Sequence, residues 1–469
     1  MKPWATAFQI AACFAMLLFL CGFGVDPADR GGTDFIVTAT PLYEPLAALH
    51  GQERFPRGAQ LLLVHEGKPE PLVSGFAATA DANVFFDGKK VLFAGKKNAA
   101  DPWQVWELVL ADRSVRKLTS AMSDAMRPLY LPGARFVYAQ RTPAGFQLEA
   151  APIDPSVASG DSANDHAILP LTYANASAIP ADVLADGRVL FESGFPLGSG
   201  ATPELFLVYS DGSGVESYRC DHGAARWGGK QLASGDVIFT HGSSLARFTS
   251  PLAHEERVPA PRAEYAGTIA ETESHAWLIS ARAASEKHYA IKLWKPGAAT
   301  MQSVLAESSN DLVEPVLVAP HDKPKRHPSG LHPWDYANLL ALDARLSRDG
   351  TLKGTPVSVR LETEDADGRA TSLGTAPVEQ DGSYFVQVPG DRPLRFALLD
   401  AHGAVLRQEH GWFWARGGEQ RICVGCHTGP ERASENRIPA VLLRTTTPVD
   451  LTAPHSAQAA ANSAGGRSE

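Results

Sequence analysis

Short apolar runs separated by turn residues make up most of the chain between residues 35 and 319. In the clearest unit, Asp87-Gly88-Lys89-Lys90 joins the apolar runs 83–86 and 91–94. Asp-Gly between two apolar runs is a strong β-hairpin signal. Comparable turns recur at spacings of 45, 54 and 48 residues, beginning at Asp87, Pro132, Asp186 and Ser234. Four-stranded propeller blades repeat with this period, so we expect a mainly β fold with a β-propeller of about six blades over residues 35–319.

For residues 35–319, seven blades or an array of β-sandwiches remain alternatives to the six-bladed propeller. Two further modules follow this region. Residues 320–335 are rich in proline, histidine and basic residues, which indicates an extended linker. Residues 336–408 alternate again, with turns at Asp381-Gly382-Ser383 and Pro389-Gly390, and predict a small antiparallel β-sandwich. An Ala/Ser/Gly-rich tail over 451–469 has the composition of a disordered segment.

The N-terminus predicts export. Residues 3–25 carry no charge and follow Lys2, as in a signal peptide with a short basic region and an apolar core. A cleaved signal peptide, lipidation at Cys21 and a retained membrane anchor are all compatible with residues 1–25, and a buried core helix is the alternative without export. We therefore expect a periplasmic protein or one anchored in the membrane and facing the periplasm.

Charge and cysteine content exclude two classes of protein. The 469 residues include 43 Lys plus Arg and 52 Asp plus Glu, a net charge of -9. Nucleic-acid binding needs clustered positive charge, so we expect no nucleic-acid partner. Five cysteines are too few for a disulfide-stapled scaffold of this length.

The strongest chemical motif is Cys423-Val424-Gly425-Cys426-His427 within residues 409–450. Two thiols at this spacing can add across the two vinyl groups of haem, and the adjacent histidine then becomes an axial iron ligand. The motif predicts one covalent haem c, with Cys423 and Cys426 as attachment points and His427 as the proximal iron ligand. A thioredoxin-like pair, a zinc half-site and a plain disulfide are the rival interpretations, but the strand–helix context of the first and the second ligand pair of a zinc site are missing.

The sixth iron ligand is not fixed by the sequence. None of the five methionines follows the motif, and the later His455 lies in the tail. His410 is the nearest upstream candidate, followed by His402 and the linker histidines His321, His327 and His332. An open sixth position is equally compatible, and it would permit ligand binding or catalysis where two strong ligands favour electron transfer.

Three other groups of residues allow either a role in haem or metal binding or a purely structural role. Trp412-Phe413-Trp414 can line a porphyrin or simply pack in a core, and Arg416 and Arg421 can pair with haem propionates or remain exposed. Cys220-Asp221-His222 can ligate a metal, although a lone thiol beside a turn histidine is the simpler interpretation because no second pair lies nearby.

The order of propeller, linker, sandwich and haem motif resembles the hydrazine synthase α-subunit family, and the blades resemble those of TolB-type propellers. The resemblance is carried by Asp381-Gly382-Ser383-Tyr384, by 389–400, by 421–427 and by Glu435-Asn436-Arg437-Ile438-Pro439. It implies haem c held at the junction of propeller and sandwich.

Two departures argue against transferring hydrazine synthesis to this chain. The family's subunit has a further C-terminal haem domain, for which we expect no counterpart here. Its first haem is served by a tyrosine four residues after the motif histidine, and this position is Glu431 here. Function depends on such site residues and not on the fold.

Three functions follow as hypotheses. The first is an exported mono-haem c protein for electron transfer or redox chemistry with an unidentified redox partner. The second is a propeller whose face binds a protein partner and whose Cys-x-x-Cys is structural. The third is a haem enzyme with an open iron that acts on a small nitrogen or oxygen species.

Overall fold

The computed structural model describes residues 34–156, 167–194, 202–219, 225–251, 253–346, 352–365, 367–409, 411–425 and 437–453. The predicted leader, the tail beyond residue 453, and the motif residues Cys426 and His427 therefore lie outside the described residues. The predicted disordered tail begins too early, because Leu451 is buried in the core of the C-terminal module and its amide donates a 2.8 Å hydrogen bond to the Gln387 carbonyl. Within the described ranges, no helix has the length and apolar character needed to cross a membrane.

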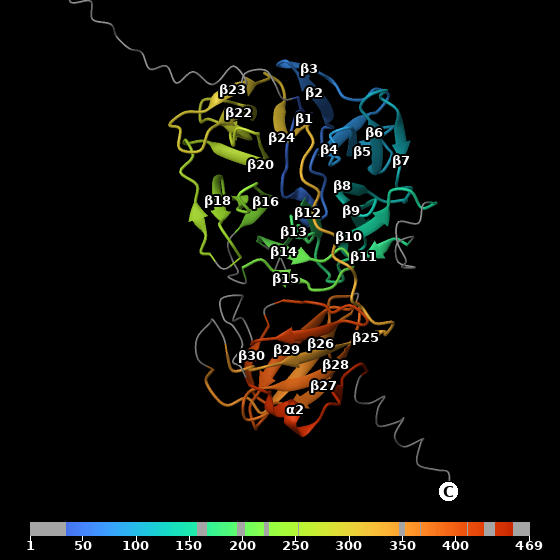
Figure 1. Ribbon diagram of the computed structural model, residues 1–469, viewed down its shortest axis with the longest axis vertical. Helices are drawn as coiled ribbons and strands as arrows, with labels where there is room; N and C mark the ends of the chain where they lie inside the picture. Colours follow the sequence, from blue (N-terminus) through green and yellow to red (C-terminus); the bar gives the residue numbers. More distant parts are fainter. Residues whose placement is uncertain are drawn as a thin grey trace, which may run out of the picture. The chain divides into compact units, whose positions relative to one another are not determined.

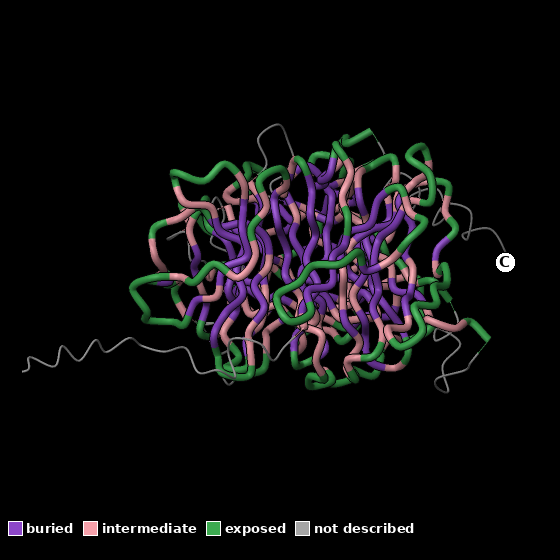
Figure 2. Tube along the Cα trace, turned by 90° about the horizontal axis from the view of Figure 1, so that it is seen from above, coloured by how far each residue is buried: buried purple, intermediate pink, exposed green. Residues whose placement is uncertain are grey.

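Six four-stranded antiparallel sheets form the propeller (Figure 1). Each buries its inner strands, and the buried residues in Figure 2 follow the strands while the exposed ones follow the connecting loops. Blade 1 consists of β24 (Asp311–Leu317), β1 (Phe35–Thr40), β2 (Gln60–His65) and β3 (Lys68–Pro71); blade 2 of β4 (Ala78–Val84), β5 (Lys90–Lys96), β6 (Gln104–Val109) and β7 (Val115–Lys117); blade 3 of β8 (Ala125–Leu131), β9 (Arg135–Thr142), β10 (Gly145–Pro152) and β11 (Leu169–Pro170).

The remaining blades repeat this order. Blade 4 consists of β12 (Ala178–Val183), β13 (Val189–Gly194), β14 (Pro203–Val208) and β15 (Glu216–Ser217); blade 5 of β16 (Arg226–Gln231), β17 (Val237–His241), β18 (Ser244–Phe248) and β19 (Glu256–Arg257); blade 6 of β20 (Glu264–Glu271), β21 (Trp277–Arg282), β22 (Ala290–Trp294) and β23 (Gln302–Leu305).

Blade 1 closes the ring, because it combines strands from both ends of the propeller sequence. Phe35 pairs with Leu317 and Thr40 with Asp311 in the antiparallel ladder between β1 and β24. All six residues of β1 are buried. This closure confirms the expected mainly β propeller and its six blades, and it excludes an array of sandwiches.

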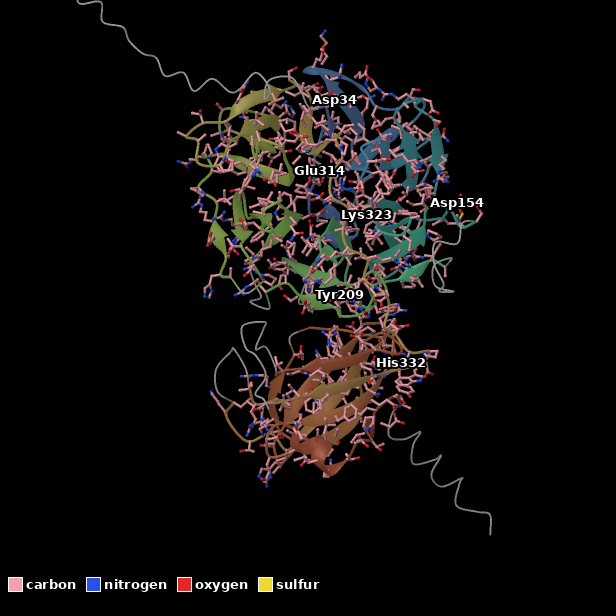
Figure 3. All side chains as sticks on the ribbon, viewed as in Figure 1. Asp34, Asp154, Tyr209, Glu314, Lys323 and His332 are labelled. Atoms are coloured by element: carbon pink, nitrogen blue, oxygen red, sulfur yellow. The ribbon has the colours of Figure 1, made fainter. Side chains whose placement is uncertain are left out.

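The propeller axis holds a buried cluster of charged residues. The Glu314 carboxylate on β24, labelled in Figure 3, pairs with Arg127 at 2.9 Å and with Arg54, while Arg54 also pairs with Asp81 at 2.6 Å. Tyr43 donates a hydrogen bond of 2.9 Å to the same carboxylate. Burial raises the pKa of Glu314, but the two arginines outweigh it and hold that pKa below its usual value.

A segment between β1 and β2 covers this charged cluster at the axis. It supplies both Tyr43 and Arg54, and contains the 3₁₀ helix η1 (Ala47–His50). Its apolar residues Tyr43, Ala48 and Phe55 join one cluster with buried side chains of all six blades, among them Ala80, Met126, Ile179, Trp227, Ala266 and Val313. The segment therefore ties the six blades together around the axis.

The linker after β24 is extended and lies against the turns of the blades (Figure 1). The backbone amides of His321 and Lys325 donate hydrogen bonds of 3.0 Å to the carbonyls of Phe86 and Ala185. These carbonyls belong to the Asp87-Gly88 and Asp186-Gly187 turns, so the residues that mark the blade repeat in the sequence also hold the linker.

Two four-stranded sheets form the sandwich. The first contains β31 (Gln420–Cys423), β25 (Tyr336–Ala341), β28 (Tyr384–Pro389) and β32 (Val449–Asp450); the second contains β27 (Ala370–Pro377), β26 (Ser358–Glu364), β29 (Leu394–Leu399) and β30 (Val405–Gln408). A short helix α2 (Ala440–Arg444) follows β31 in sequence.

The sandwich differs in two respects from the antiparallel module expected over 336–408. The strands β31 and β32 come from the predicted haem segment 409–450 and pair in parallel with β25 and β28. They have four and two residues, too few for an alternation signal. The described strands β31 and β32 of the predicted haem segment are therefore part of a sandwich sheet.

We predict that Gly187→Ala loosens the linker. A Cβ at this position would lie 2.2 Å from the Lys325 carbonyl oxygen, and Gly187 has φ of +93°. Gly235 has φ of +91° with no atom within 4 Å of its Cβ position, so Gly235→Ala carries the same backbone strain without the clash. Limited trypsinolysis after Lys325 and Arg326 should accelerate about tenfold or more in Gly187→Ala only, and equal rates in both variants would contradict the linker contact.

Candidate functional site

Cys423 is the last residue of an edge strand in the sandwich. β31 runs parallel to β25, with Ile422 opposite Leu340 and Cys423 opposite Ala341. The Leu342 amide donates a 2.8 Å hydrogen bond to the Cys423 carbonyl, which fixes the strand up to this residue. Because β31 has a neighbour on one side only, the thiol lies at the open edge of the sheet.

The two faces of β31 differ in character. Arg421 and Cys423 lie on the face of their partners Leu339 and Ala341, which are core residues, whereas Ile422 points away and is 66% exposed. The Cys423 thiol is free and only partly exposed. Burial raises its pKa, opposed by the nearby Arg421 and reinforced by Glu409 and Glu419.

Trp412-Phe413-Trp414 connects the sandwich to the propeller. Phe413 exchanges backbone hydrogen bonds of 2.7 and 3.0 Å with Leu394 of β29 and packs against the cores of both modules. Trp414 is 4% exposed and belongs to the core between blades 3 and 4, where its indole N–H donates to the Gly212 carbonyl. These aromatics form an interdomain wedge, so Phe413 and Trp414 pack in a core, and their role in lining a porphyrin stays a prediction.

Two arginines reinforce the same junction. Arg421 donates to the carbonyls of Val215 and Trp414, so it joins β31 to blade 4. Arg416 donates to the Pro170 carbonyl at 2.8 Å and to the Tyr173 hydroxyl. The structure places both guanidinium groups in contacts between the sandwich and the propeller. Their pairing with haem propionates stays a prediction.

Asp381 holds the chain where it returns from the haem motif. Its carboxylate accepts hydrogen bonds from the Arg437 guanidinium, from the Ala440 amide at 2.8 Å and from the Ser383 hydroxyl at 2.6 Å. The Ser383 hydroxyl oxygen in turn accepts the Val441 amide at 3.1 Å. The sequence marked Asp381-Gly382-Ser383 as a turn and as part of the family resemblance, and its role as a clamp on 437–441 was missed because nothing in the spacing links the two segments.

Several predicted site residues lie outside the described residues, namely Cys426, His427, His410 and the Cys220-Asp221-His222 group. The described histidines of the linker have other contacts. The ring of His327 stacks on Tyr209 at 3.9 Å, that of His332 on Trp334 at 4.4 Å, and His321 meets Phe86 edge-on at 5.5 Å. His402 lies in the exposed turn that Asp400 caps. In the part of the chain that the structure describes, no group of three potential metal-ligating side chains occurs.

The surroundings of Cys423 nonetheless fit a covalently attached haem. Cys423 carries a free thiol at the end of an edge strand, and the sequence places Cys426 and His427 three and four residues beyond it. The Arg421 guanidinium lies over the Phe413 ring, with 5.8 Å between the guanidinium carbon and the ring centroid. Cys423, Cys426 and His427 would hold the group, and Arg421 and Asp381 would fix the chain on either side of it.

Comparison with known proteins supports the resemblance found in the sequence. Residues 346–428 match the family model of the hydrazine synthase alpha subunit middle domain. The structure of the hydrazine synthase of Kuenenia stuttgartiensis superposes with a TM-score of 0.74 at 17% sequence identity, covering 88% of this chain and 71% of that chain. The segment 346–428 is thus related to this middle domain, and the chain shares the fold of that structure.

Solved structures of TolB proteins also resemble this chain, at lower TM-scores. TolB from Acinetobacter baumannii gives a TM-score of 0.44 at 13% identity, covering 61% of this chain and 66% of that chain. The putative TolB from Agrobacterium tumefaciens gives 0.40 at 12% identity, covering 60% and 92%. No curated protein matches the sequence.

We predict that Asp381→Asn releases the clamp on 437–441. The hydrogen bonds from Ser383 and Ala440 and the Arg437 charge outweigh partial burial and lower the Asp381 pKa to about 2 from 3.8. The stabilisation is therefore present above pH 3.8 and is lost as the pH falls towards 2. With the side chain 16% exposed, it should amount to about 1–2 kcal/mol.

Hydrogen exchange of the Ala440 and Val441 amides at pH 5 measures this effect. Exchange should be about tenfold faster or more in Asp381→Asn, and protection in the wild type should decline between pH 4 and 2. Asp367→Asn, in an exposed turn of the same sandwich, is the control. Unchanged exchange in Asp381→Asn would show that the carboxylate does not hold this segment.

Proposed function

We propose that the chain is an exported mono-haem c protein for electron transfer or redox chemistry, with the haem held between propeller and sandwich. Thioether bonds from Cys423 and Cys426 attach the haem, and His427 is the proximal iron ligand. The observation that carries the proposal is the free Cys423 thiol at the end of an edge strand that Arg421 anchors to blade 4. The relation of residues 346–428 to the hydrazine synthase alpha subunit middle domain supports it.

The protein's own contribution is to hold and orient this group. Bound haem supplies a one-electron carrier. Arg421 fixes the strand that leads into the motif, and Asp381 fixes the segment that leaves it. The Phe413 and Trp414 wedge keeps both against blades 3 and 4. The strand that would hold the haem is thus anchored by both modules, which would limit the movement of an attached haem.

Export and partners belong to the same proposal. Haem c is attached outside the cytoplasm in bacteria, which agrees with the apolar leader over residues 1–25. A membrane anchor at this leader would keep the protein at the periplasmic side, and the propeller face offers a surface for a protein partner. The net charge of -9 favours a basic partner.

A haem enzyme with an open iron is the second candidate. It is favoured by the described linker histidines, whose rings lie against Phe86, Tyr209 and Trp334 and not at a shared site. In this candidate His410 does not ligate the iron, and the sixth position is left for an exogenous small nitrogen or oxygen species. Hydrazine synthesis is not part of this proposal, because Glu431 replaces the family tyrosine.

The absorption spectrum of the full chain, matured in a periplasm with haem-attachment machinery, tests the main proposal. We expect a red protein whose haem remains covalently bound after denaturation and gives a c-type band in alkaline pyridine. Cys423→Ala with Cys426→Ala should lose all covalent haem, and Cys423→Ala alone most of it. A colourless wild type, or covalent haem retained in the double variant, would overturn the proposal and favour a protein-binding propeller with a structural Cys-x-x-Cys.

Carbon monoxide separates the two haem functions. The reduced protein should show no spectral response to carbon monoxide if His410 completes the coordination, and His410→Ala should then produce one. An immediate response in the wild type, unchanged in His410→Ala, would instead identify an open iron and support the enzyme. His402→Ala, in an exposed turn, is the matched control and should respond like the wild type.

A further inference from the structure

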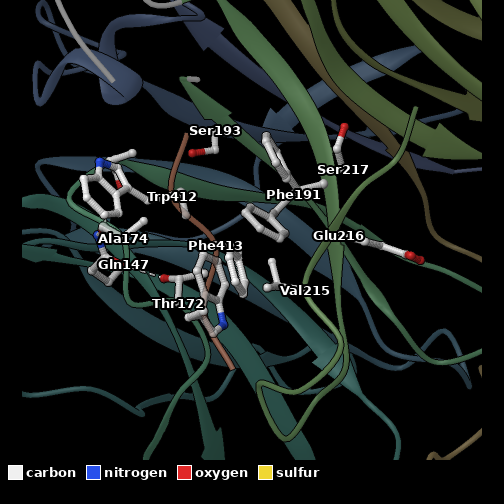
Figure 4. Close-up of a pocket in the computed structure, with 14 residues that line it drawn as sticks. Gln147, Thr172, Ala174, Phe191, Ser193, Val215, Glu216, Ser217, Trp412 and Phe413 are labelled. Carbon is white, nitrogen blue, oxygen red and sulfur yellow. Dashed lines mark hydrogen bonds between the residues drawn. The ribbon is translucent and has the colours of Figure 1, made fainter. Parts of the chain in front are cut away.

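A small apolar cavity lies at the junction of propeller and sandwich. It has a volume of about 60 Å³ and is bounded by Phe191, Phe206 and Val215 of blade 4 and by the Trp412–Trp414 wedge (Figure 4). Ala174, from the loop between β11 and β12, forms part of its wall. Neither module forms this cavity alone, since the wedge supplies one wall and the blades supply the others.

Three polar side chains of the wall, Gln147, Thr172 and Ser193, make their hydrogen bonds within the wall, mainly with backbone groups. The Gln147 amide N–H donates to the carbonyls of Ala174 at 3.0 Å and Ala176 at 2.9 Å. The Thr172 hydroxyl donates to the Gln147 side-chain oxygen at 2.7 Å, and its oxygen accepts the Leu148 amide at 2.9 Å. The Ser193 hydroxyl donates to the Ser177 carbonyl at 3.0 Å.

A water molecule in this cavity would have few partners. Waters are held well where two to four polar groups bind them. This cavity is partly open to solvent, and an apolar guest that displaces a poorly held water from it is favoured. An apolar cavity of about 150 Å³ accommodates benzene or xenon, so a volume of about 60 Å³ excludes the ring and leaves atoms and diatomic molecules.

We propose that this cavity binds a small apolar molecule of the size of xenon or of a diatomic gas such as dioxygen or nitric oxide. The aromatic rings of Phe191, Phe206 and Phe413 supply the dispersion contacts, and no charge or donor on the guest is required. The inference does not depend on haem attachment, because the cavity wall contains none of the three haem-binding residues.

Xenon titration followed by ¹²⁹Xe NMR tests this site in the full-length protein. The wild type should show a saturable, protein-dependent change of the xenon chemical shift. Ala174→Leu places three further carbons at the cavity wall and should lower xenon affinity at least tenfold. Ala260→Leu is the matched control, because Ala260 is also partly buried and lies in the equivalent loop between blades 5 and 6, from β19 to β20.

Two outcomes would overturn the proposal. A wild type without a saturable shift has no such site, and equal shifts in all three proteins place the xenon elsewhere. Phe206→Leu, which enlarges the cavity, should increase the shift and keeps the test valid if Ala174→Leu does not fold. Circular dichroism checks folding of each variant, and repeating the titration on Cys423→Ala with Cys426→Ala separates this result from that of the haem proposal.

Discussion

The buried carboxylate of Glu314 is the constraint on which the propeller depends. An ionised carboxylate removed from water costs several kcal/mol unless opposite charges and hydrogen-bond donors surround it. Glu314 is carried by the strand that closes the ring, and its partners Arg54 and Arg127 come from the segment between β1 and β2 and from blade 3. Neutralising this one group therefore requires the ring to be closed, the segment between β1 and β2 to be in place at the axis, and the blades to be in register at the same time.

The same strand determines where the rest of the chain goes. The linker leaves β24 beside the turns of blades 2 and 4, and its hydrogen bonds to Phe86 and Ala185 guide it to the sandwich. The sandwich in turn contacts the propeller through Trp414, Arg416 and Arg421. Cys423 lies two residues beyond the last of these contacts, so its position is set by propeller and sandwich together.

The parts of the fold that depend on a few neighbouring residues could be predicted from the sequence. Asp87-Gly88 and Asp186-Gly187 predict hairpins because the turn needs a residue with positive φ, and their spacing predicts the blades. The roles of Arg421 and Trp414 could not be predicted, because both depend on Val215 and Gly212, about 200 residues earlier in the chain. The haem motif is predicted from sequence alone because its chemistry lies within five consecutive residues, and it stays a prediction. The clamp of Asp381 on Arg437 could not be predicted in this way, because it joins segments 56 residues apart.

Ring closure also has a consequence for the order of folding. β1 is made first but finds its partner β24 only when residue 317 has been synthesised, 282 residues after Phe35. At translation rates of about 5–20 residues per second, this delay is roughly 15 to 60 s. Pairing at such a long sequence separation carries a larger loop-closure entropy than the local hairpins, so we expect ring closure to be a late step of folding. During this interval the apolar edge of β1 has no partner, so a chaperone that shelters Phe35–Thr40 would protect the nascent chain from aggregation.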